Sequence, residues 1–195
     1  EIAEQVTFLA AVREDLEALE DRPINEIVVS YREPTNVTYL GMNRELSPLD
    51  SAEVRLALST CVDRTELAAS TFPSGTIVAN QFLPPSTFGF TAGLLWYEHD
   101  ADYAKALLAG AGYTEGLTLT LSYPGVPSDF LPEPTRVAEA LREQLEACDI
   151  SVNLEMMGAG EFETALVGGK LGLHLSGWST YFPGPISFLN THFVG

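Results

Sequence analysis

The sequence predicts an α/β or mixed α+β fold, in which a mixed sheet is flanked by helices. Helical and strand periods alternate along most of the 195 residues. Several segments alternate apolar and polar residues, as half-buried strands do. Hydrophobic residues make up 46% of the chain, enough for one sizeable core. Because no repeat or linker divides the chain, we expect a single domain over residues 1–195.

The first part of the chain predicts a mixture of strands and helices. Strands are expected at residues 1–6, 26–31 and 36–43, and a helix at residues 8–21, ending before Pro23. Two more helices are expected within residues 47–70. Asp50 can cap the first of these as a capping-box variant, because Glu53 stands three residues later. Asp63 and Arg64 then interrupt the pattern. A structural role as cap or ion pair is preferred for them over acid–base chemistry.

Residues 71–98 are irregular and rich in Pro, Gly, Ser and aromatic side chains. A loop of this length is usually functional or packed as an Ω-loop. Trp96 and Tyr97 are expected to anchor it.

The second half of the chain alternates regularly between helices and strands. Helices are expected at residues 100–113, 133–149 and 160–169, strands at 117–123, 150–157 and 171–178, and a final helix from residue 185. Asp100 is the expected N-cap of the first of these helices, Gly110 or Gly112 its stop, and Pro134 suits the first turn of the second.

Charge and composition limit the classes of partner. The net charge of −17 repels nucleic acid and anionic membranes. No apolar run is long enough to cross a bilayer. The chain starts without Met or a signal segment, so we expect a fragment of a longer protein. Cys61 and Cys148 each fall on the apolar side of a predicted helix. Two buried free thiols are the preferred interpretation, and a disulfide stays open.

No enzyme, metal or cofactor motif emerges from the sequence. The "GAGEFE" segment lacks the full dinucleotide fingerprint, and no phosphate loop or nucleophile elbow occurs. The acidic "EHDAD" segment, residues 98–102, offers a possible cation site, but a solvated helix start is preferred. We therefore expect no catalysis, no metal and no cofactor.

Several segments in sequence order resemble the bacterial extracellular solute-binding proteins of family 5, which serve peptide-type ABC transporters. They are "TYLGMN", "VRLALSTCVDRTEL", "FLPPSTFGF", "YEHDADYAKALLAGAGY", "LTLTLSY", "VAEALREQLEACDISVNLE" and "SGWSTYFPGP". The resemblance covers roughly residues 37–193. It implies the second lobe of a periplasmic-binding-protein type II clamshell, with the first lobe absent from this chain. It also implies an extracytoplasmic location, a peptide or other small solute, and an ABC permease as partner.

The resemblance places the solute at the turn after the "Gly-Trp" strand. We expect Trp178, Ser179, Thr180 and Tyr181 to bind it, with the indole as an apolar wall. A core tryptophan is the alternative for Trp178, and a turn-closing role the alternative for Ser179 and Thr180. Peptide binders often carry Asp three residues after this Trp, to hold the terminal ammonium. Here Tyr181 stands there, and no acid follows Glu163.

Two other functional classes stay open. One is a mixed α/β enzyme with an unrecognised site. The other is a sensory or interaction module built on the same lobe. The aromatic side chains of residues 82–90 either approach the solute or pack on the sheet.

Overall fold

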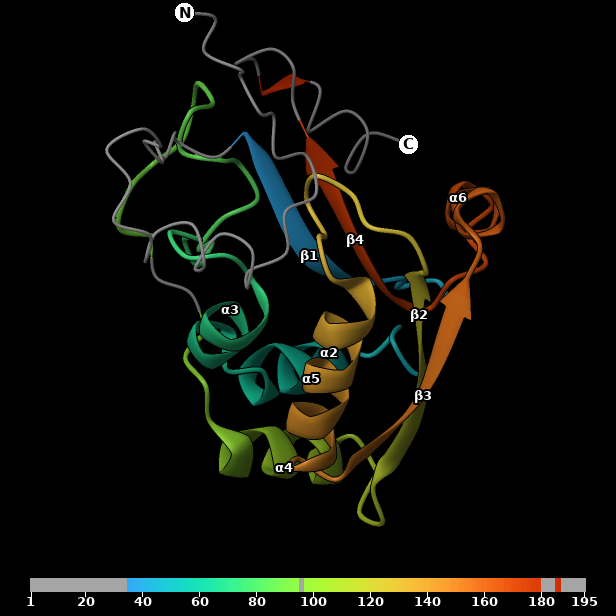
Figure 1. The fold of residues 1–195 in the computed structure, drawn as a ribbon. Coiled ribbons are helices and arrows are strands. Elements are labelled where there is room, and N and C mark those ends of the chain that lie inside the picture. Colours follow the sequence, from blue (N-terminus) through green and yellow to red (C-terminus); the bar gives the residue numbers. More distant parts are fainter. Residues whose placement is uncertain (1–34, 95–96, 180–184, 187–195) are drawn as a thin grey trace, which may run out of the picture.

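A computed structural model describes residues 35–94, 97–179 and 185–186 (Figure 1). It confirms the mixed α/β architecture, with helices around one mixed sheet. The strands are β1 (Asn36–Met42), β2 (Leu117–Pro124), β3 (Ile150–Met157) and β4 (Leu173–Ser179). The helices are α2 (Ala52–Cys61), α3 (Arg64–Thr71), α4 (Ala101–Gly110), α5 (Pro134–Glu146) and α6 (Ala159–Val167). The elements expected at residues 1–6, 8–21 and 26–31, and most of the helix expected from residue 185, lie outside the described residues.

The strand order in the sheet is β1-β4-β2-β3. Strand β1 is antiparallel to β4, whereas β4, β2 and β3 run parallel to one another. The last residues of β2, β3 and β4 therefore lie along one edge of the sheet, together with the first residue of β1. We call this the carboxyl edge; its strand residues are Asn36, Pro124, Met157 and Ser179.

The core lies on one face of the sheet. Alternation along the strands sends leucines such as Leu119, Leu121 and Leu175 to that face, where they pack with side chains of α2, α4 and α5. The opposite face carries polar residues, among them Thr118 and Thr120, which are exposed. Figure 1 shows α6 on the other side of the sheet from α5. None of the described helices is both long enough and apolar enough to span a bilayer.

The observed helix caps agree with the sequence except at one position. Asp63 accepts hydrogen bonds from two backbone N–H groups at the start of α3, and Asp100 accepts one at the start of α4, as predicted. The cap predicted at Asp50 is wrong by one residue. The Ser51 hydroxyl accepts from the Val54 N–H (3.3 Å) and donates to Glu53 (2.8 Å), while Asp50 accepts from the Ser51 N–H.

The preference for two free thiols is wrong, because Cys61 and Cys148 form a disulfide. Their Cα atoms lie 6.2 Å apart, within the range that a disulfide spans. Both cysteines are fully buried, as expected. The apolar sides that bury the two thiols also bring the end of α2 against the turn after α5. The apolar pattern of each helix predicts that its cysteine is buried, but it does not predict that the two cysteines come into contact.

The segment after α3 packs on itself and on the sheet. Gln81 donates to the Thr91 carbonyl (2.8 Å), and Asn80 donates to the Leu94 carbonyl (3.1 Å). The Phe82 ring packs on Tyr39 of β1, with ring centroids 5.5 Å apart. This packing agrees with the Ω-loop interpretation. Phe88, by contrast, is 82% exposed, so the aromatics of residues 82–90 do not all pack down.

Arg64 closes this loop at its base. Its guanidinium donates to the carbonyls of Ala79 and Tyr97, each at 2.9 Å. Partial burial lowers the pKa of Arg64 from its usual value, and the neighbouring Asp63 carboxylate opposes that shift. Tyr97 thus anchors the loop through its backbone, while its ring is exposed. The structural role expected for residues 63 and 64 is confirmed.

The Arg64→Ala variant should open the loop without unfolding the core. It removes two hydrogen bonds from a charged donor to backbone carbonyls, so cleavage by a protease within residues 72–98 should become faster. The rates are compared by timed digestion and mass mapping of fragments. The matched control is Arg142→Ala, because Arg142 makes only a long, half-exposed ion pair with Glu146 (4.0 Å). Equal cleavage rates in all three proteins would contradict the anchoring role of Arg64.

Candidate solute-binding edge

The structure describes two of the four residues expected to bind a solute. Trp178 and Ser179 are the last two residues of β4 and lie at the carboxyl edge. Thr180 and Tyr181 lie outside the described residues. In open sheets with parallel strands, ligands bind beyond the carboxyl ends of the strands. Trp178 and Ser179 therefore occupy a position at which a ligand is expected.

Trp178 is paired with Val37 of β1 and is partly exposed. Its face of the sheet also carries Tyr39 and Ser176, which are paired with each other one step further in. Burial raises the pKa of Tyr39, and a hydrogen bond with the Ser176 side chain partly opposes the shift. The phenol is therefore neutral near pH 7. The Trp178 indole thus lies between the Tyr39–Ser176 pair and the carboxyl edge of the sheet.

Ser179 points to the other face, because alternate residues of a strand face opposite ways. Its hydroxyl donates a hydrogen bond to the Asp129 carboxylate, with 2.5 Å between the two oxygens. Asp129 belongs to the connection between β2 and α5 and is exposed. The edge thus brings together two segments that lie 50 residues apart in sequence.

Three further contacts hold residues 128–131, which we call the edge loop, against β1 and β4. Asn36 donates from its side-chain amide to the Asp129 carbonyl (2.8 Å), and the Thr38 hydroxyl donates to the Phe130 carbonyl. The Phe130 ring lies directly against the backbone of Gly177. Figure 1 shows this connection crossing in front of the upper part of β4 before it enters α5.

Sequence reasoning missed the edge loop altogether. One signal was present, since "PGVPSDFLPEP" follows the carboxyl end of one strand and precedes a helix. Loops in that place frequently carry binding residues. What the sequence does not reveal is the sheet order, which sets β4 beside β2 and so brings Ser179 to the loop that follows β2.

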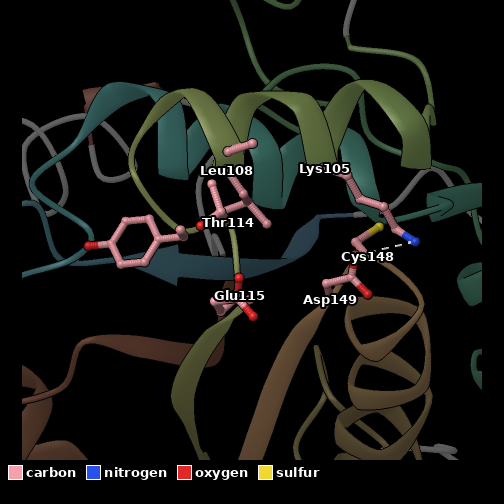
Figure 2. A pocket seen from close by; sticks show the side chains of 9 residues that line it. Lys105, Leu108, Thr114, Glu115, Cys148 and Asp149 are labelled. Atoms are coloured by element: carbon pink, nitrogen blue, oxygen red, sulfur yellow. Dashed lines mark ion pairs between the residues drawn. The ribbon is translucent and has the colours of Figure 1, made fainter.

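A hollow of about 450 Å³ lies at the opposite end of the sheet (Figure 2). It is formed where α4, the start of β2 and the turn before β3 meet. Lys105 and Asp149 form an ion pair of 3.5 Å across it, and both side chains are substantially exposed. Glu115 and the disulfide-bonded Cys148 also line it. The Lys105 ammonium is thus already partnered, and neither Trp178 nor Ser179, the two predicted site residues that the structure describes, lines this hollow.

The acidic segment of residues 98–102 is a helix start. Asp100 accepts from the Tyr103 N–H (2.8 Å), and its own N–H donates to the Thr60 carbonyl (2.8 Å). Within the part of the chain that the structure describes, no three His, Cys, Asp or Glu side chains come together in a way that could hold a metal ion.

A mixed sheet with helices around it and a polar carboxyl edge is an architecture in which ligands bind beyond the strand ends. The family model of bacterial extracellular solute-binding proteins, family 5 (middle region), matches residues 3–195 of this chain. The chain belongs to this family.

Known relatives agree with that assignment. The dipeptide-binding protein of Escherichia coli K12 is 27% identical over 158 residues, which are 81% of this chain and 30% of the relative. The heme-binding protein A of Haemophilus influenzae is 28% identical over 155 residues, 80% of this chain and 28% of the relative. The solved structure of HbpA2 from Haemophilus parasuis superposes with a TM-score of 0.83 at 26% identity. The superposed region covers 91% of this chain and 34% of the HbpA2 chain.

These similarities confirm the type II periplasmic-binding-protein fold. The chain spans about a third of the length of the relatives that it matches.

Proposed function

We propose that this chain is the second lobe of the solute-binding component of an ABC importer. The observation that carries the proposal is the family match over residues 3–195, which takes up almost the whole chain. In this proposal residues 1–195 form a single domain, and the first lobe belongs to other segments of the full-length protein. A solute binds between the lobes, the lobes close on it, and the closed form delivers it to the membrane permease.

The carboxyl edge is the proposed contribution of this lobe to the solute site. Trp178 supplies an apolar wall, and Ser179, Thr180 and Tyr181 supply polar groups beside it. The partial exposure of Trp178 and the position of Ser179 at the strand end support this assignment. The proposed role is capture of the solute, without a catalytic step.

The disulfide supports an extracytoplasmic location. Structural disulfides form and persist in oxidising compartments and are rare in the cytosol. The bond between Cys61 and Cys148 is fully buried, and it joins α2 to the turn after α5, as a structural crosslink does.

A solute screen on the full-length protein tests the proposed function. Peptides, sugars, heme and metal ions are added singly, and unfolding is followed by thermal shift. A true solute at ~100 times its Kd should stabilise the protein by roughly 2.7 kcal/mol. The Trp178→Ala variant should lose most of that shift, while Tyr103→Ala, which removes an exposed aromatic of α4, should keep it. If no compound of any class shifts the full-length protein, the proposed function is wrong.

A further inference from the structure

The connection between α3 and α4 combines exposed apolar side chains with a complete absence of charge. Residues 67–97 contain no Asp, Glu, Lys, Arg or His, although the chain carries 10 Lys and Arg and 27 Asp and Glu residues. Three large apolar side chains of this connection are well exposed: Phe88 at 82%, Ile77 at 60% and Leu94 at 45%. We call residues 72–94 the neutral loop. Apolar groups that gather on an exposed surface commonly mark a contact with another surface.

The tip of the neutral loop presents Phe88 from a fixed turn. The Thr87 N–H donates to the Pro84 carbonyl (3.0 Å), and the Phe90 N–H donates to the Thr87 carbonyl (3.1 Å). Thr87 is 3% exposed and Pro84 is buried, so the backbone that carries Phe88 is itself packed. Because the turn is already formed, burying the Phe88 ring requires little further ordering of the backbone.

The neutral loop lies at the end of the sheet that carries the carboxyl edge. The Phe82 ring packs on Tyr39 of β1, with 5.5 Å between the ring centroids. Figure 1 shows the loop in green beside the upper end of β1, the end toward which the arrow of β4 points. In the proposed function this end of the lobe faces the first lobe. The neutral loop therefore borders the gap that closes around a solute.

We propose that the neutral loop packs against the first lobe when the two lobes close, with Phe88 as its main contact. This inference rests on the proposed function. The chain spans about a third of the length of its relatives, so a protein of that length has ample surface outside this chain to cover the loop. The first lobe belongs to the same molecule and is therefore present at a high effective concentration. An uncharged contact surface also requires no charged group to leave water when the gap closes.

The proposed contact changes the closure equilibrium without touching the solute. A side chain that is buried only in the closed form favours that form, and the apparent affinity for a solute rises with the population of the closed form. Loss of the contact therefore weakens the binding of every solute by the same factor. Loss of a residue that touches the solute, by contrast, affects different solutes to different extents.

Photocrosslinking on the full-length protein tests which surface covers the loop. Benzoylphenylalanine replaces Phe88, and the products are mapped by mass spectrometry with and without trialanine, dileucine, maltotriose or heme. We expect intramolecular crosslinks to peptides outside residues 1–195, in higher yield with a probe that binds. The control carries the same group at Val167, which is 84% exposed and ends α6, the helix that runs back from the carboxyl edge. It should give no crosslink to the first lobe.

Calorimetry with the same four probes measures the effect on closure. In Phe88→Ser the Kd of each probe that binds should rise at least about 10-fold, and by the same factor for all of them, because one large apolar side chain is no longer buried. Val167→Ser removes a similarly exposed apolar side chain and should leave each Kd unchanged. Since both side chains are exposed in this lobe, both variants should fold, as checked by circular dichroism.

The outcomes separate this inference from the proposed function. If a probe binds but the group at position 88 crosslinks only within residues 1–195 or to a second molecule, the inference is overturned while the proposed function stands. The same holds if Phe88→Ser leaves the Kd of a bound probe unchanged. If no compound in the wider screen binds, the proposed function fails. Crosslinks from position 88 to the first lobe would then still support the contact, and their absence would overturn it as well.

Discussion

Loss of the disulfide between Cys61 and Cys148 should cost about 4 kcal/mol of unfolding free energy. The bond closes a loop with a sequence separation of 87 residues. A crosslink of that span removes much of the conformational freedom of the unfolded chain, and chain-entropy estimates reach about 4.7 kcal/mol for a 100-residue loop. The change is measured by urea unfolding of the full-length protein, with and without reductant.

The double variant Cys61→Ala/Cys148→Ala is the control for the reductant. It should unfold at the urea concentration of the reduced protein, and adding reductant should not change it further. An oxidised protein that is no more stable than its reduced form would contradict the crosslink. Because both sulfur atoms are buried, reduction is expected to need partial unfolding first.

The Gly177→Ala variant should destabilise the lobe by about 1–3 kcal/mol, the usual cost of overpacking. A Cβ at this position would enter the Phe130 ring and come within 2.8 Å of the Val37 carbonyl oxygen. The ring belongs to the edge loop, and the carbonyl belongs to β1. The added methyl group should therefore push the edge loop away from β4 and weaken solute binding as well.

Gly172→Ala is the matched control for that variant. It lies just before β4, and a Cβ there would meet only a leucine methyl group at 3.6 Å, an ordinary contact. Its stability and solute affinity should stay close to those of the parent protein, as judged by thermal unfolding and calorimetry. If Gly177→Ala behaves like Gly172→Ala, the edge loop is not seated on β4 as described.

Much of the fold could be predicted because its signals are local. Strand alternation in "LTLTLSY" and "ISVNLEMM" placed β2 and β3 almost to the residue. The caps at Asp63 and Asp100 depend only on a carboxylate that reaches N–H groups two or three residues later. These features need no knowledge of distant contacts.

The features that were missed depend on contacts between distant segments. The disulfide requires the end of α2 to meet the turn after α5, and neither helix taken alone shows which part of the chain its apolar side will meet. The link from Ser179 to Asp129 similarly requires β4 to lie beside β2. The sequence indicated an edge with a tryptophan and hydroxyl groups, but it did not reveal the Asp129 carboxylate that accepts a hydrogen bond from Ser179.

The most direct test of the account is the crystal structure of the full-length protein with a bound solute. The account predicts that the solute lies between the two lobes and contacts the indole of Trp178 at the carboxyl edge. A solute bound only in the hollow beside Lys105, or held entirely by the other lobe, would contradict it.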